Sequence, residues 1–315
     1  MHKLSTDILT GNRSALARTI TLVESTLVAH QEEAQSIIQD LLPYSGQSLR
    51  IGITGVPGVG KSTFIEALGK HLTTQGKKVA VLAIDPSSEK SGGSILGDKT
   101  RMNELSADDL AFIRPSPTAG SLGGVARRTR ESIILCEAAG YEVILIETVG
   151  VGQSETVVHS MVDVFLLMML AGAGDELQGI KRGIMEMADI LLINKADGDN
   201  LLSAKKAQAQ YKTALHLFPP NENGWTTPVD ICSAQQKTGI AQAWQHLNDF
   251  QQWTTERGFF EKQRQEQQRY WLKHLIQEHL QSDFYQKHHA KIQNLEEDLA
   301  KGKLTPSQAL DQLFK

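Results

Sequence analysis

Cysteine is scarce in this chain: only Cys136 and Cys232 occur among 315 residues. The two stand far apart, and neither belongs to a Cys-x-x-Cys pair. This count and spacing exclude a disulfide framework and a thiolate zinc site, and they favour a reducing compartment.

Long apolar runs and an excess of one charge are also missing. The most apolar run, Val164 to Leu170, is too short to cross a bilayer, and the first residues lack the apolar stretch of a secretory signal. The net charge of −4 creates no basic field for nucleic acid or an anionic membrane. We therefore expect a soluble, cytoplasmic protein that binds neither nucleic acid nor membrane.

What the chain does contain is a series of short apolar segments alternating with helical ones. Continuously apolar runs of this length predict strands of a parallel sheet that is buried on both faces. The predicted strands are Leu49 to Thr54, Val79 to Ile84, Ala111 to Arg114, Val143 to Glu147, Val164 to Leu170, Ile190 to Asn194 and Val229 to Cys232. The fold class is α/β, with a mostly parallel sheet flanked by helices over residues 46–250.

Helical segments flank this predicted domain on both sides. Apolar residues recur at helical spacing from about Ser14 to Leu42, which predicts a helical N-terminal extension over residues 1–45. Residues 251–315 form a polar helical arm with a sparse apolar stripe, and a last helix is expected with Thr305 as its N-cap and Pro306 in its first turn. The stripe fits a dimerisation arm, and it equally fits an arm folded onto its own domain.

A phosphate-binding loop follows the first predicted strand and opens a helix at Lys61, which is the context this motif requires. The glycines turn backbone N–H groups toward phosphate, and Lys61 reaches the outer phosphates. Ser62 is predicted to supply a hydroxyl to Mg²⁺. The predicted nucleotide contacts in this loop are Gly55, Val56, Pro57, Gly58, Val59, Gly60, Lys61, Ser62 and Thr63.

A second loop has the composition needed to read guanine. Asn194, Lys195 and Asp197 follow a buried strand, so they lie at the carboxyl edge of the sheet, where ligands bind. The carboxylate of Asp197 can accept hydrogen bonds from two guanine N–H groups that adenine does not offer, so adenine would leave it unpaired. Ser233 and Ala234 are expected to add backbone contacts to the base, and Asn194 to tie the loop to neighbouring segments.

Three acids are candidates for the shell around Mg²⁺ and the attacking water, because phosphoryl transfer depends on positioning and charge stabilisation. Asp85 and Glu147 end predicted strands, and Asp98 lies in a Gly-rich loop. The alternative for each is a solvent-facing or helix-capping carboxylate. We predict Ser62, Asp85, Asp98 and Glu147 as metal ligands, and Lys61, Asp85 and Glu147 as catalytic residues.

Further residues are expected to respond to the nucleotide. Gly150 would present a backbone N–H to the γ-phosphate, so that hydrolysis frees the following loop, Val151 to Glu155. Gln153 is a candidate for positioning water, and a plain polar loop residue is its alternative. The glycine-rich segment Gly172 to Lys181 resembles a third switch loop, in which Lys181 either meets Glu147 or the nucleotide or is a surface lysine.

Taken together these residues closely resemble the methylmalonyl-CoA mutase-associated GTPases, the MeaB/ArgK family of the SIMIBI class of P-loop proteins. The resemblance covers almost the whole chain. Its most specific element is Glu147, which stands in place of the usual Asp and is followed by Thr-Val-Gly-Val-Gly-Gln-Ser-Glu. Other matching segments are Gly55 to Ser62, Ile84 to Ser88, Gly92 to Asp98, Leu122 to Ala126, Gly172 to Lys181 and Asn194 to Asp197.

The resemblance implies a P-loop NTPase fold and a homodimeric, Mg²⁺-dependent GTPase. It implies a chaperone that binds GTP or GDP, does not itself bind cobalamin, and serves an adenosylcobalamin-dependent methylmalonyl-CoA mutase. GTP hydrolysis would gate cofactor loading and would protect or reactivate the mutase. By the same resemblance, Asp175 and Lys181 belong to a third switch that answers the mutase, and the arm builds the dimer.

Two other functions compete with this interpretation. A metal-insertion GTPase of the same class would carry His-rich or Cys-bearing segments, whereas the densest spot here is His288-His289, for which a solvated helix face is the simpler explanation. A protein kinase linked to amino-acid transport would need an acceptor-specific base and site, which the sequence does not show.

Overall fold

The structure, a computed structural model, describes residues 1–84, 102–115, 122–148, 154–172 and 182–314. The chain divides into two compact units, residues 1–264 and 265–315. Helix α11 runs through residue 251, and helix α12 begins in the first unit and supplies most of the second. The boundaries expected near residues 45 and 250 stay predictions.

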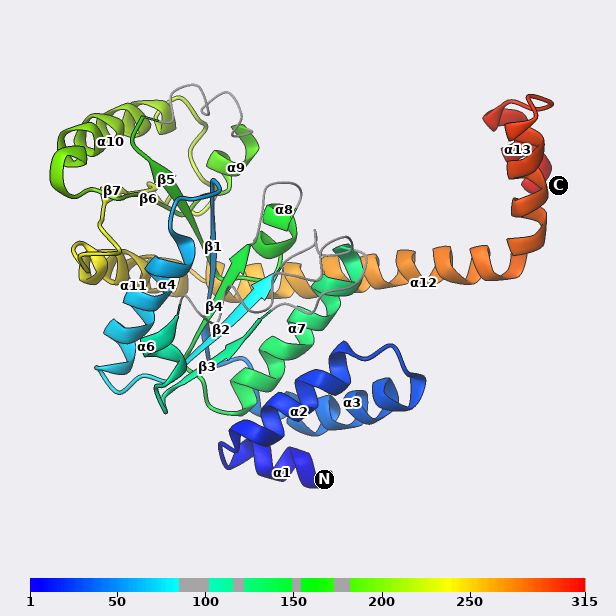
Figure 1. The fold of residues 1–315 in the computed structure, drawn as a ribbon, viewed down its shortest axis with the longest axis horizontal. Helices are drawn as coiled ribbons and strands as arrows, with labels where there is room; N and C mark the ends of the chain where they lie inside the picture. The colour runs from blue at the N-terminus through cyan, green and yellow to red at the C-terminus, as the bar shows by residue number, and fades with distance from the viewer. Residues whose placement is uncertain (85–101, 116–121, 149–153, 173–181, 315) are drawn as a thin grey trace. The chain divides into compact units, whose positions relative to one another are not determined.

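A seven-stranded sheet forms the centre of the first unit (Figure 1). Its order is β3-β2-β4-β1-β5-β6-β7, and every strand pairing among the described residues is parallel. This confirms the predicted P-loop fold class with its helical extensions. The strands are β1 (Leu49–Gly55), β2 (Val79–Ile84), β3 (Ala111–Arg114), β4 (Val143–Thr148), β5 (Val164–Leu170), β6 (Ile190–Asn194) and β7 (Val229–Ile231).

Helices cover both faces of the sheet, as continuous apolar strands require. Alternate residues of β5 enter different clusters: Leu166 packs in the cluster that includes α4 and α11, and Leu167 packs with α10. The helices of the described chain are α1 (Lys3–Leu9), α2 (Arg13–Glu24), α3 (Val28–Leu41), α4 (Lys61–Thr73), α6 (Asn103–Ser106), α7 (Leu122–Ala138), α8 (Ser154–His159), α9 (Arg182–Glu186), α10 (Leu201–Leu215), α11 (Ile240–Glu256), α12 (Phe259–Ala300) and α13 (Pro306–Leu313), with 3-10 turns at Leu42–Tyr44 and Gly198–Asn200.

The predicted elements agree with these bounds closely, with three differences. Strands β1 and β4 each extend one residue further, to Gly55 and Thr148, and β7 ends one residue earlier. The helical stretch after Ser14 is two helices, α2 and α3. The short helix α1 lies within the extension predicted over residues 1–45, but ahead of the apolar pattern that was followed from about Ser14. The Asp40 carboxylate holds its start by accepting from His2 N at 2.6 Å and Ser5 Oγ at 2.9 Å.

Both edge strands of the sheet are short. On β7, the side chain of Gln208 from α10 donates to Val229 O at 2.8 Å. On β3, Arg114 forms an ion pair with Glu24 of α2. Side chains of the flanking helices therefore contact both edges.

The second unit consists of the rest of α12 and α13. Thr305 caps α13 in a full capping box with Gln308, and Pro306 occupies the first turn, which confirms the predicted start of this helix. Phe284 and Phe314 stack with ring centroids 5.2 Å apart, and Lys291 Nζ donates to Leu313 O at 3.2 Å. These contacts hold α13 against the end of α12.

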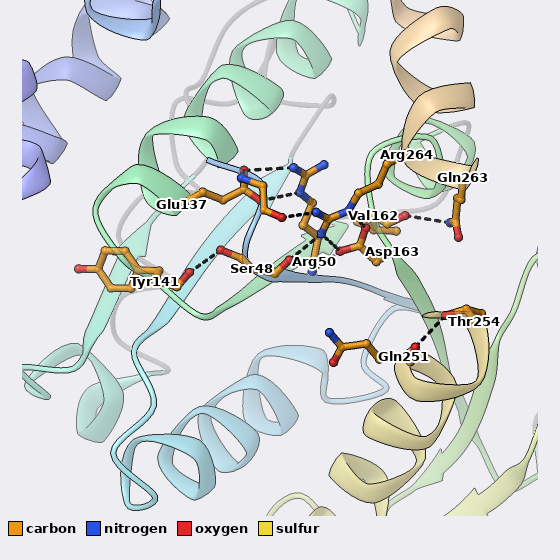
Figure 2. A network of polar contacts seen from close by, with 11 residues as sticks. Ser48, Arg50, Glu137, Tyr141, Val162, Asp163, Gln251, Thr254, Gln263 and Arg264 are labelled. Carbon is orange, nitrogen blue, oxygen red and sulfur yellow. Dashed lines mark hydrogen bonds and ion pairs between the residues drawn. The ribbon is translucent and has the colours of Figure 1, made fainter. Parts of the chain in front are cut away.

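A buried ion-pair network ties the start of α12 to the amino edge of the sheet (Figure 2). Arg264 donates from Nε and Nη2 to the two carboxylate oxygens of Asp163, each at 2.7 Å, and also to the carbonyls of Gly46 and Ser48. Asp163 in turn accepts from Arg50 N at 2.8 Å. Burial opposes the charge on Arg264, but hydrogen bonding and attraction to Asp163 outweigh it and raise the pKa of Arg264.

Arg50 extends this network along β1. Its guanidinium donates to the two carboxylate oxygens of Glu137 at 2.8 and 3.1 Å, and Glu137 also accepts from Gly46 N at 2.8 Å. Each buried carboxylate therefore meets a guanidinium and a backbone N–H. This is the arrangement that lets buried charges persist in a protein interior.

The first prediction concerns Arg264. Changing it to Ala should lower the free energy of unfolding by about 3–5 kcal/mol, because Asp163 would remain buried without its guanidinium partner. The measurement is the urea midpoint followed by circular dichroism. Arg269→Ala, an exposed position on the same helix, is the matched control and should change stability by less than about 0.5 kcal/mol. Equal midpoints for the two variants would contradict the role given to the network.

Candidate functional site

The phosphate loop joins β1 to α4 at the centre of the sheet. Gly60 is the residue before α4, with a φ of 94°, and no side chain caps this helix end. The first-turn N–H groups of α4 are therefore left for a ligand. Within the loop, Val59 is fully buried and Val56 nearly so, whereas Pro57, Gly58 and Thr63 face solvent.

Two glycines of this loop are required by close approach. A Cβ at Gly55 would collide with the backbone carbonyl of Met168 on β5, and a Cβ at Gly60 would lie 2.8 Å from Asn194 Nδ2. Gly58, with a φ of 74°, has nothing within 4 Å of the Cβ position. Gly60 is therefore constrained by a neighbour as well as by its backbone, and Gly58 by its backbone alone.

Lys61 is buried at the start of α4. Its Nζ donates to Gly55 O at 2.9 Å, so the ammonium lies inside the loop. Burial lowers the pKa of Lys61, and the carboxylates of Glu147 and Glu155 partly offset this by favouring the charged form. Glu155 lies in the first turn of α8 and is 4% exposed. The sequence interpretation placed Glu155 at the end of a switch loop over Val151 to Glu155 and did not connect it with Lys61. In the structure Glu155 belongs to α8, and its burial there depends on packing that the sequence does not reveal.

Ser62 and Glu147 meet across the site. Ser62 Oγ donates to Glu147 Oε1 at 3.0 Å, and Glu147 is 4% exposed near the end of β4. The next residue, Thr148, donates through Oγ1 to Thr54 Oγ1 at 2.9 Å, which links the ends of β4 and β1. Mg²⁺ prefers oxygen ligands, and Ser62 and Glu147 bring a hydroxyl oxygen and a carboxylate oxygen close together. This pair therefore fits a magnesium ion.

Asn194 connects the phosphate loop to the loop after β7. Its Nδ2 donates to Val59 O at 2.8 Å, and its Oδ1 accepts from Ala234 N at 3.0 Å. The expectation that Asn194 ties neighbouring segments together is confirmed. Any direct contact between Asn194 and a nucleotide stays a prediction.

Asp197 lies beside Ser233 at the same edge of the sheet. Ser233 Oγ donates to Asp197 Oδ2 and accepts from Gln236 N at 3.2 Å, so the hydroxyl holds the carboxylate in one orientation. Lys195 has an unusual φ of 60°, and its carbonyl accepts from Asn200 Nδ2 at 2.6 Å. The sequence predicted only backbone contacts for Ser233, because the side-chain pairing depends on how two loops 36 residues apart approach each other.

The other predicted site residues cannot be placed. Asp85, Asp98, Gly150, Gln153, Asp175 and Lys181 lie outside the described residues. Of the four predicted metal ligands, only Ser62 and Glu147 are described, and they lie together. The roles of all these residues stay predictions.

Two kinds of feature are absent from the described part of the chain. There, no group of three or more His, Cys, Asp or Glu side chains is arranged to hold a metal ion. No helix in that part has both the length and the apolar character required to cross a membrane.

The second prediction concerns the two loop glycines. Gly60→Ala should lower the free energy of unfolding by about 3 kcal/mol, since the methyl group adds displacement of the Asn194 amide to the cost of a left-handed alanine. Gly58→Ala, the matched control, should cost about 1 kcal/mol, because only the backbone conformation is penalised. Urea unfolding of the two variants measures the difference, and equal losses would argue against contact between Gly60 and Asn194.

The sequence is similar to a known protein family and to individual proteins over almost its whole length. A family model described as "Methylmalonyl Co-A mutase-associated GTPase MeaB" matches residues 16–289. A probable GTPase of Mycobacterium tuberculosis is 50% identical over 314 residues, covering 99% of this chain and 94% of its own length. The mitochondrial methylmalonic aciduria type A homolog of Mus musculus is 47% identical over 329 residues, covering 100% of this chain and 79% of its own.

A solved structure extends the likeness to three dimensions. The crystal structure of a protein described as LAO/AO transport system kinase superposes with a TM-score of 0.80 at 38% sequence identity. It covers 99% of this chain and 95% of the solved one. The likeness therefore includes the helical regions before and after the sheet domain in the sequence.

Proposed function

The chain belongs to the family of methylmalonyl Co-A mutase-associated GTPases, MeaB, and we propose that it is the GTP-driven chaperone of an adenosylcobalamin-dependent methylmalonyl-CoA mutase. GTP hydrolysis is the activity of this family. In the proposed role, hydrolysis gates the loading of the mutase with its cofactor and protects or reactivates the mutase. The match to the family model over residues 16–289 is the observation that carries the proposal.

The site geometry is consistent with hydrolysis of GTP by these residues. We assign Lys61 to the outer phosphates, since its buried ammonium already lies inside the loop. We assign Ser62 and Glu147 to a magnesium ion, which when bound neutralises charge on the phosphate oxygens. Asp85 and Asp98 are proposed to complete that shell, and Gly150, Gln153, Asp175 and Lys181 to respond to the nucleotide.

Selection of guanine is assigned to Asp197. The Ser233 hydroxyl donates to Oδ2 of Asp197, and this bond fixes the plane of the Asp197 carboxylate. A carboxylate held in this way loses little freedom when it accepts two N–H groups of a base, and it would be left unsatisfied by adenine. The pairing of Asp197 with Ser233 therefore supports a preference for GTP.

The second unit is proposed to form a homodimer. Leu272, Leu275, Ile276 and Leu280 lie on one face of α12 and are between 36% and 61% exposed. Their spacing of three and four residues makes a continuous apolar stripe, which is a typical helix-pairing surface. A second copy of the chain would bury it.

The third prediction tests the chaperone role directly. The purified chain should hydrolyse GTP slowly alone and faster when its cognate mutase is added, because the partner completes the switch segments. The measurement is phosphate release with and without mutase, together with sizing chromatography of the mixture. A Lys61→Ala variant should show no stimulation, which assigns the measured rate to this chain. An equal rate of GTP hydrolysis with and without mutase, together with no complex on sizing chromatography, would refute the proposal.

The fourth prediction concerns pH and Glu155. GTP binding should weaken as pH rises through the pKa of Lys61, since the neutral amine loses its attraction for phosphate. The Glu155 carboxylate raises that pKa, so Glu155→Gln should move the alkaline loss of binding to lower pH. Affinity for GTP measured across pH 7 to about 10 tests this.

A matched control for that experiment is Glu222→Gln. Glu222 is exposed in the segment before β7 and should leave the pH profile unchanged. If Glu155→Gln gave the wild-type profile, the carboxylate would have no electrostatic role at Lys61.

A further inference from the structure

A hollow lies at the β3 edge of the sheet, between the N-terminal extension and β3. It has a volume of about 470 Å³, which is within the range of small-molecule sites. Residues of α2, α6 and β3 line it, among them Arg13, Ser14, Ser106, Phe112, Ile113 and Arg114. None of the residues assigned above to GTP or magnesium is among the described residues that line it.

The lining has a marked chemical bias. Arg13, Arg114, Ser14 and Ser106 line the hollow, and none of the described residues that line it is acidic. The Arg114 guanidinium is paired with Glu24, and the Ser106 hydroxyl donates to Asn103 O at 3.1 Å. Phe112 and Ile113 provide an apolar wall, and Phe112 is kept in place by Tyr141, whose ring centroid is 5.9 Å away. The hollow therefore combines donors for an anion with an apolar surface.

Arg114 is held rigidly in this wall. Its Nε donates to Glu24 Oε1 at 3.0 Å, and its Nη2 donates to Glu24 Oε2 and to Thr21 Oγ1. These bonds take Nε–H and both Nη2–H groups, and the side chain is 26% exposed. The two N–H groups of Nη1 are the donors that this guanidinium has left for a ligand, and fixing the rest of the group limits the loss of side-chain freedom on binding.

Arg13 is held more loosely and is more accessible. Its Nη1 donates to Asp108 O at 3.3 Å and lies 3.8 Å from the carboxylate of Asp109, whose side chain is fully exposed. A solvated pair at this distance contributes little and is readily exchanged. The Asp108 carboxylate is already engaged by Lys70 Nζ at 2.5 Å, so it does not neutralise Arg13.

We propose that the hollow is a binding site for a phosphate monoester that carries a compact apolar or aromatic group. The dianionic, tetrahedral phosphate has enough oxygens to meet Arg13, Nη1 of Arg114 and the Ser14 hydroxyl together, whereas a carboxylate has only two. The apolar group would rest on the wall of Phe112 and Ile113. The site is separate from the phosphate loop, because β2 and β4 lie between β3 and β1 in the sheet.

The test uses phenyl phosphate as the probe and the full-length protein saturated with GDP and Mg²⁺, so that the phosphate loop is filled. Isothermal titration or ligand-observed NMR should detect saturable binding to the wild type. Arg13→Gln should weaken that binding about tenfold, as expected for loss of one charged hydrogen-bond donor. Arg18→Gln, an exposed arginine on the same helix, should leave it unchanged.

Two further measurements protect the result. Ala17 of α2 also lines the hollow, so Ala17→Glu, which adds a carboxylate there, should also weaken binding. Unfolding midpoints of all variants establish that they are folded. Benzoate should bind more weakly than phenyl phosphate. The proposal is overturned by absence of saturable binding to the wild type, by equal binding of Arg13→Gln and Arg18→Gln, or by benzoate binding as tightly as phenyl phosphate.

Discussion

The geometry of the GTPase site depends on one side-chain amide, that of Asn194. It donates to Val59 O in the phosphate loop and accepts from Ala234 N in the loop after β7, so a single planar group sets the distance between these segments. An aspartate at position 194 could not donate to Val59 O, and a leucine there could neither donate nor accept. The amide also occupies the space that a Cβ at Gly60 would need. The loop proposed to bind phosphate and a loop proposed to contact the base are therefore joined through the same few atoms.

The two ends of the parallel strands have different tasks. At the carboxyl ends, Ser62 of α4 bonds Glu147 of β4, and Asp197 bonds Ser233 from another loop. At the amino ends, Arg264, Asp163 and Arg50 form a dense network of buried charge, as Figure 2 shows. Because β1 begins at one and ends at the other, rigidity at its start is compatible with loop adjustment at its end.

How much the sequence could predict depended on the range of the interaction. The seven strands were found because a strand buried on both faces leaves a continuous apolar run, and Lys61 because its motif is local. The bond from Arg264 to Asp163 spans 101 residues, and the hydroxyl of Ser233 reaches Asp197 from another loop, so neither left a pattern in the sequence. Glu155 and Thr148 are buried by the packing of strands and helices, which no spacing reveals.

The Gln208 side chain that donates to Val229 O has a consequence for the behaviour of the protein at high concentration. An edge strand with open carbonyls is a template on which a strand of another molecule can add. Here β7 is three residues long and one of its carbonyls is already bound, while β3 is four residues long and is followed directly by Pro115. Neither edge offers enough backbone for such addition, so the sheet resists aggregation through its own strands.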